Sequence, residues 1–178
     1  MAIISQRRVR AYFATSARAG NTTAQGRALE SLICYVLSRI PGVDRITTNP
    51  LNIFKTEEID VSFWNDGLTR GLTFLPTVML VECKNWSHAV GSQEVAYFAA
   101  RLRHRGSQYG LLIAANGITG DPGDLSRAHY EMATALAEGQ RILVITKAEL
   151  LQLTHSEQFV ALLKEKICDL VVSGTCLG

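Results

Sequence analysis

Apolar positions recur at helical spacing near the start of the chain. The stripe predicts a helix over residues 24–40. Thr22 or Thr23 can cap its start, because a threonine hydroxyl accepts a hydrogen bond from a backbone N–H of the first turn. Pro41-Gly42 is typical of the point where a helix ends.

Three strand patterns follow this helix. Residues 43–48 and 58–64 are expected as strands, and in the second one apolar and polar residues alternate. Residues 77–84 begin as a nearly continuous apolar run, as in a strand buried on both faces. This third strand is therefore expected at the centre of a sheet.

The second half of the chain alternates helical and strand patterns. Helices are predicted over 91–105, 125–138 and 148–168, and apolar strands over 109–115 and 141–146. With the first half, the order becomes αβββαβαβα. This order predicts a layered α/β domain.

Composition and charge narrow the class of protein. The 178 residues are 47% hydrophobic and 19% charged, as in one ordinary globular domain, and no apolar run is long enough to cross a membrane. The net charge is only +2, yet five arginines precede the first acidic residue, Glu30. We therefore expect a flexible or partner-bound basic arm over 1–22, with a transit segment as the alternative, and a single domain over 23–178.

The four cysteines are too few and too scattered for a disulfide-stapled secreted domain. Reduced cysteines and a cytoplasmic location are expected. Cys83 and His88 lack a second pair at zinc spacing, so a structural zinc site is not expected.

Charged residues end the apolar strand over 77–84. Glu82 and Lys84 are two residues apart, so their side chains leave the same face, roughly 6 to 7 Å apart along the strand. If the preceding strand pairs antiparallel with this one, Asp60 comes to lie beside Glu82. Two carboxylates with open positions for water suit Mg²⁺ or Mn²⁺, and a neighbouring lysine could orient an attacking water. The alternative is an ordinary salt bridge at a strand end.

These residues resemble the PD-(D/E)xK nuclease signature, with Ile59-Asp60-Val61 followed by Val81-Glu82-Cys83-Lys84. In the Mrr-like restriction endonuclease branch a Gly-x-x-x-Glu helix comes first, and Gly26 to Glu30 matches it. The later patterns are also similar, so that the resemblance covers about residues 24–152. It implies an α/β fold with a restriction-endonuclease-like αβββαβ core, in which helices flank a mixed central sheet.

The resemblance also implies roles for individual residues. Asp60, Glu82 and the backbone carbonyl of Cys83 would bind the divalent metal, Lys84 would position the nucleophilic water, and Glu30 would complete the site. The usual proline before the aspartate motif is replaced here by Glu58-Ile59. Gln93 and Tyr97 share a helix face and resemble the Gln-x-x-x-Tyr motif of RecB-like nucleases, which makes Gln93 a further candidate.

The resulting hypothesis is a Mg²⁺-dependent nuclease, with Mn²⁺ as a substitute, that hydrolyses DNA phosphodiester bonds in restriction or defence. Arg101, Arg103 and Arg105 are candidates for phosphate contact, although cations at a helix C-terminus also complement its dipole. DNA, a protein partner that supplies specificity and a second copy of the chain are the expected partners, and a membrane is not. A non-catalytic binding module of the same fold and a structure-specific repair nuclease remain as alternatives.

Overall fold

A computed structural model describes residues 2–19, 22–51, 58–123 and 126–177. Its helices are α1 (Gln6–Arg18), α2 (Thr22–Leu37), α3 (Ser92–His104), α4 (Ala128–Ala137), α5 (Lys147–Leu150) and α6 (Ser156–Ser173). Its strands are β1 (Val43–Thr48), β2 (Val61–Asn65), β3 (Val78–Lys84), β4 (Tyr109–Ala114) and β5 (Arg141–Ile145).

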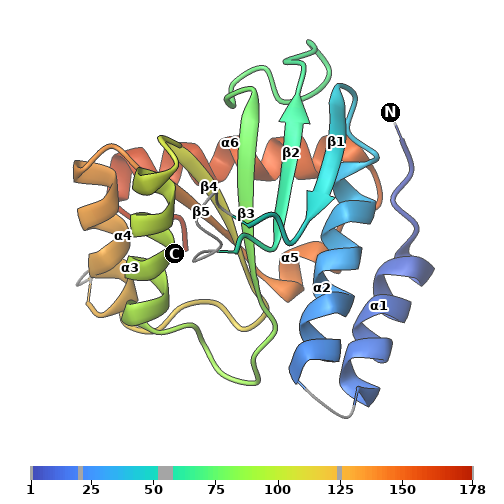
Figure 1. Cartoon of the computed structure of the whole chain (residues 1–178), viewed down its shortest axis with the longest axis horizontal. Coiled ribbons are helices and arrows are strands. Elements are labelled where there is room, and N and C mark those ends of the chain that lie inside the picture. Colours follow the sequence, from blue (N-terminus) through green and yellow to red (C-terminus); the bar gives the residue numbers. More distant parts are fainter. Residues whose placement is uncertain (1, 20–21, 52–57, 124–125, 178) are drawn as a thin grey trace.

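The five strands form one mixed sheet in the order β1-β2-β3-β4-β5. The first three strands pair antiparallel, and β3, β4 and β5 pair parallel. Helix α6 crosses behind the sheet, whereas α1 and α2 lie in front of it on the β1 side (Figure 1). The predicted α/β class, with a mixed central sheet flanked by helices, is confirmed.

Strand β3 is central, as its apolar run predicted. Every residue from Met79 to Cys83 is buried. Helix α3 packs closely on the neighbouring β4 because Gly110 has no side chain: a Cβ there would lie 2.6 Å from Cζ of Phe98. This close approach brings α3 to the sheet beside the end of β3.

The N-terminal residues differ from the predicted flexible arm. Residues 6–18 form α1, which Ser5 caps by accepting a hydrogen bond from the Arg8 N–H. Val9 and Phe13 are buried in the core, and α1 packs along α2. Two apolar side chains one helical turn apart are enough to dock a helix whose other positions are mostly basic or small. Residues 1 and 20–21 of the predicted arm lie outside the described residues.

The helical pattern predicted over residues 148–168 forms two helices in the structure. Instead of one helix over 148–168, α5 ends at Leu150 and α6 begins at Ser156. Gln158 explains the new start, because its side chain accepts hydrogen bonds from the backbone N–H groups of Thr154 and His155. The predicted helix over 125–138 begins at Ala128, and residue 125 lies outside the described residues.

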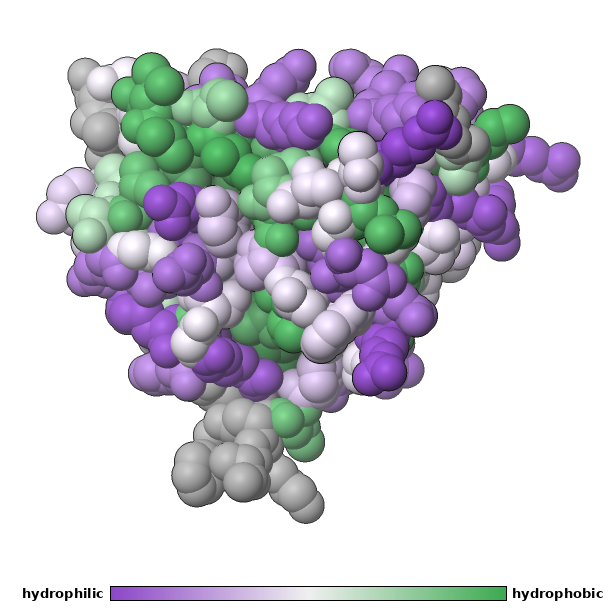
Figure 2. Space-filling model, turned by 90° about the horizontal axis from the view of Figure 1, so that it is seen from above, coloured by the Kyte–Doolittle hydropathy of each residue, from purple (hydrophilic) through white to green (hydrophobic). Residues whose placement is uncertain are grey.

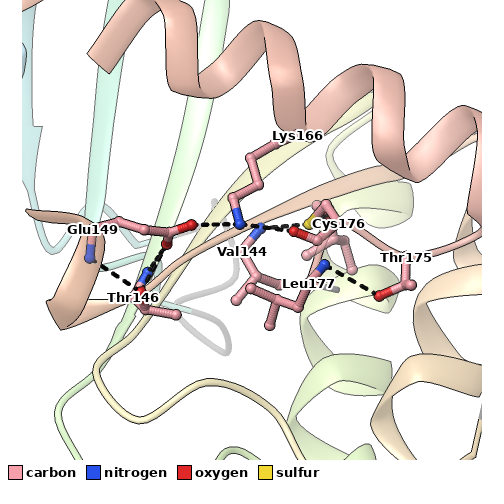
Figure 3. Close-up of polar contacts among 8 residues, drawn as sticks. Val144, Thr146, Glu149, Lys166, Thr175, Cys176 and Leu177 are labelled. Carbon is pink, nitrogen blue, oxygen red and sulfur yellow. Dashed lines mark hydrogen bonds and ion pairs between the residues drawn. The ribbon is translucent and has the colours of Figure 1, made fainter. Parts of the chain in front are cut away.

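The C-terminal residues close the outer edge of β5 (Figure 3). Gly174 ends α6 in the left-handed conformation, and the chain turns so that Cys176 is buried. The Val144 N–H of β5 donates to the Cys176 sulfur, at 3.2 Å. Buried Lys166 donates to the Cys176 carbonyl at 2.7 Å and pairs with Glu149 at 2.5 Å. An edge strand is thus covered rather than exposed.

At the end of the sheet where β2 ends and β3 begins, hydrophobic and hydrophilic residues are interspersed on the surface (Figure 2). Leu68 and Val78 expose about half of their surface there. Within the described residues, no helix has the length and apolar character that crossing a membrane requires.

Candidate active site

A cavity of about 990 Å³ lies at the opposite end of β3. It is lined by the start of α2, the residues before β2, the end of β3 with the loop that follows, and Glu94 of α3. Glu30, Asp60, Cys83 and Lys84 all line it. Four residues singled out in the sequence therefore share one hollow.

Asp60 lies directly before β2. The antiparallel register sets Val61 opposite Val81, so the chain brings Asp60 to the level of Glu82. The Cys83 N–H donates to Oδ2 of Asp60 at 2.6 Å. Burial and then the negative charge of Glu82 raise the pKa of Asp60 to about 6. Such a shift is expected where carboxylates gather out of water without a nearby cation to balance both of them.

Glu82 is almost fully buried, at 3% exposure. Its Oε1 lies 2.8 Å from Nζ of Lys84, and its Oε2 lies 2.8 Å from Nη1 of Arg101. Both carboxylate oxygens are therefore held by cations. The same-face salt bridge that the sequence offered as the alternative is therefore present, but its carboxylate is buried rather than exposed.

Lys84 is the more accessible partner of Glu82, with 23% of its side chain exposed. Its ammonium lies 5.7 Å from the centre of the Trp86 ring. The ring and the Glu82 carboxylate hold the lysine at the wall of the cavity, where its remaining N–H groups can meet water or an anion.

Glu30 reaches the cavity from α2. Asn49 donates to its Oε2 at 3.5 Å, a long hydrogen bond. Burial is the largest cause of its raised pKa, and the charges of Glu58 and Glu82 act in the same direction. Glu30 thus belongs to the same negative cluster as Asp60 and Glu82.

The backbone of Cys83 completes the donor set. Within a strand the N–H and C=O of one residue face the same neighbour, so the Cys83 carbonyl faces the Asp60 side, as its N–H does. Burial raises the pKa of the Cys83 thiol well above its usual range, which leaves the carbonyl oxygen as the donor. In the described part of the chain, no three His, Cys, Asp or Glu side chains are grouped for metal binding. Two carboxylates and one carbonyl still suit a hard cation that keeps several waters.

The other predicted site residues lie elsewhere. Gln93 is exposed, donates to the Tyr97 hydroxyl at 2.7 Å and does not line the cavity, whereas its neighbour Glu94 does. Arg103 pairs with Glu138, the residue that follows α4. Arg105 lines a separate cavity at the far end of β3. Their predicted roles stay predictions.

The sequence reasoning missed the contact between Arg101 and Glu82. Arg101 lies seven residues after Glu94, two helical turns along the same face of α3, and that spacing is the signal that could have placed it at the site. It also missed Asn85, which donates to the Gln25 carbonyl at 3.0 Å and to Ser16. Asn85 thereby ties the loop after β3 to both N-terminal helices.

Comparison with known families agrees with this geometry. A family model described as a restriction endonuclease, of the Mrr catalytic type, matches residues 22–154. The match begins at α2 and ends just before α6, so it includes the cavity and all five strands. No curated protein matches the chain.

Proposed function

The chain belongs to the Mrr-like restriction endonuclease family of PD-(D/E)xK nucleases, and on that premise we propose that it hydrolyses DNA phosphodiester bonds with the help of Mg²⁺. The observation that carries the proposal is that Asp60 and Lys84 line one cavity while buried Glu82 pairs with Lys84 and raises the pKa of Asp60. Neighbouring carboxylates beside a lysine are the kind of groups that metal-assisted hydrolysis uses.

Each residue has a distinct task in this proposal. Asp60, Glu82 and the Cys83 carbonyl would hold the divalent ion, and Glu30 would bind one of its waters. The ion, when bound, supplies a Lewis acid for the phosphate and lowers the pKa of water. Lys84 donates a hydrogen bond to the attacking water and balances the charge that develops on phosphate oxygens. Arg101 holds the second oxygen of Glu82 and so fixes the orientation of that carboxylate.

A plasmid assay tests the proposal. Supercoiled DNA is incubated with the protein in Mg²⁺, in Mn²⁺ or in EDTA, and nicked and linear products are measured. We expect metal-dependent cleavage that Lys84→Ala abolishes, and Lys164→Ala, which removes an exposed lysine of α6, is the matched control. Cleavage that survives in EDTA or in Lys84→Ala would overturn the proposed site. A folded protein that binds DNA but never cleaves it would favour the non-catalytic module.

The proposal also covers the biological role, the location and the assembly of the protein. A restriction or defence role follows from the family, and a structure-specific repair nuclease would use the same residues. Four free cysteines support a reducing, cytoplasmic location. Since one active site cuts one strand, cleavage of both strands favours a homodimer. A protein partner would supply sequence specificity.

A further inference from the structure

Two arginines meet on one buried aromatic ring, away from the candidate active site. Tyr35 of α2 is only 8% exposed, and its hydroxyl accepts a hydrogen bond from the Ser5 N–H at 2.8 Å. The guanidinium carbon of Arg8, on α1, lies 4.7 Å from the centre of this ring. That of Arg39, just after α2, lies 5.0 Å from the same centre. We call Arg8, Tyr35 and Arg39 the arginine cluster.

The cluster gathers positive charge. Its two guanidinium groups lie within about 10 Å of each other, since both lie within 5.0 Å of one ring centre. Like charges that lie closer than about 8 Å, the Debye length in physiological salt, repel, and salt screens most of the repulsion beyond that distance. Within the described residues neither arginine forms an ion pair with a carboxylate, and Nε of Arg39 is buried without a hydrogen-bond partner. An anion would offset the repulsion and could accept hydrogen bonds from both groups.

A groove connects the cluster to the active site. A cavity of about 620 Å³ is lined by Tyr12 of α1, by Tyr35 and other residues of α2, and by the end of β1. It shares Arg27, Glu30 and Asn49 with the active-site cavity. Of the arginine cluster only Tyr35 lines this groove, so a ligand that follows the groove from the active site reaches the ring on which Arg8 and Arg39 lie.

The distance between the two places suits a nucleic-acid strand. Arg39 follows Glu30 by nine residues, almost all of them in α2, which corresponds to roughly 13 Å at about 1.5 Å per residue. One strand of a DNA duplex advances about 3.4 Å per nucleotide along the duplex axis, and its phosphates lie farther apart than this because the strand winds around the axis, so this length spans at most about four nucleotides. The planar fork of arginine matches phosphate geometry.

We propose that the arginine cluster binds a backbone phosphate of the DNA substrate, within about four nucleotides of the bond that is cut. The inference rests on the proposed nuclease function, because it takes the cavity around Asp60 as the place of cleavage. It gives the N-terminal helix α1 a part in holding the substrate. Tyr35 prepares the site by fixing both guanidinium groups before DNA arrives.

The test measures binding separately from cleavage. A short fluorescent DNA duplex is titrated with the full chain in EDTA, where no metal-dependent cleavage occurs, over a series of salt concentrations. We expect Arg8→Gln/Arg39→Gln to weaken binding by about tenfold or more. We also expect the slope of log affinity against log salt to fall by about 1, as for one lost phosphate contact. Arg8→Lys/Arg39→Lys keeps both charges and should keep most of the slope.

Arg70→Gln is the matched control, because Arg70 is equally charged and exposed but lies between β2 and β3, at the other end of the sheet. An Arg8→Gln/Arg39→Gln protein with the affinity and salt slope of the wild type would overturn the proposal. So would an equal loss in Arg70→Gln. If the double variant unfolds, Arg8→Gln alone is used, since Arg8 is exposed and should by itself give a weaker but measurable loss. Loss of the proposed function would instead appear as a wild type that fails to cleave plasmid with metal.

Discussion

Replacing Asp60 by asparagine should make the metal-free protein more stable. In the folded protein, burial and the charge of Glu82 raise the pKa of Asp60 from 3.8 to about 6. Above that pH the Asp60 side chain is charged in both states, and the charged form costs more free energy in the folded state than in the unfolded state. At about 1.36 kcal/mol for each pH unit, the cost at neutral pH is about 3 kcal/mol. Asparagine removes the charge, and its carbonyl can still accept the Cys83 N–H.

The sign of the pH dependence follows from the raised pKa. The cost is fully present above about pH 6 and disappears as the pH falls toward 3.8, since Asp60 is then protonated in both states. The difference in stability between Asp60→Asn and wild type should therefore be largest near neutral pH and vanish near pH 4. In thermal unfolding this difference in stability corresponds to a Tm of Asp60→Asn that is higher by roughly 5 to 10 °C for a chain of this size.

The assay is thermal or urea unfolding in EDTA at a series of pH values. Asp169→Asn, at an exposed position of α6, is the matched control. Added Mg²⁺ should raise the Tm of the wild type and leave that of Asp60→Asn nearly unchanged. The reasoning is refuted if Asp60→Asn is no more stable than wild type near pH 7.5 in EDTA, or if its advantage does not depend on pH.

Three further outcomes are expected. Arg101→Met should lower the stability of the metal-free protein by about 1.5 to 3 kcal/mol, because almost fully buried Glu82 then keeps only Lys84 as a partner. Arg101→Lys should recover part of the lost stability. If wild type and Arg101→Met unfold at the same urea concentration, the ion pair is contradicted. Lys166→Met should cost about 3 kcal/mol in urea unfolding, since it leaves Glu149 and the Cys176 carbonyl without their cation. Cys168 is exposed and should be alkylated first in the native protein. Cys83 and Cys176 are buried and have raised thiol pKa values, so they should be alkylated only when the protein unfolds. Mass spectrometry of the alkylated protein measures the order of reaction.

The meeting of Asp60 with Glu82 could be predicted from the sequence because strand geometry fixes it. Side chains alternate along a strand, so Glu82 and Lys84 had to share a face. The sequence allowed an antiparallel pairing of the two strands without deciding it, and that pairing, which the structure shows, sets Asp60 at the level of Glu82. Only the strand period and the direction of pairing were needed.

Contacts between layers could not be predicted in the same way. Arg101 reaches Glu82 only because α3 docks on β4 at Gly110 with one particular rotation about its axis. Helix α1 was missed because its charge pattern is conspicuous, while its apolar face consists of little more than Val9 and Phe13. Both features depend on how closely two elements pack, which the period of one element does not reveal.

The two carboxylates of the site have different surroundings, and the difference indicates where a cation is needed. Glu82 has a cation on each oxygen, so its charge is balanced although it is almost fully buried. Asp60 accepts one hydrogen bond, from the Cys83 N–H, and burial followed by the charge of Glu82 raises its pKa although Lys84 lowers it. The deficit of positive charge therefore lies on the Asp60 side of the pair, where the cavity opens and where the Cys83 carbonyl also faces. In the proposed function Asp60, Glu82 and the Cys83 carbonyl would hold a divalent ion, and Arg101 on Oε2 of Glu82 would keep that carboxylate oriented.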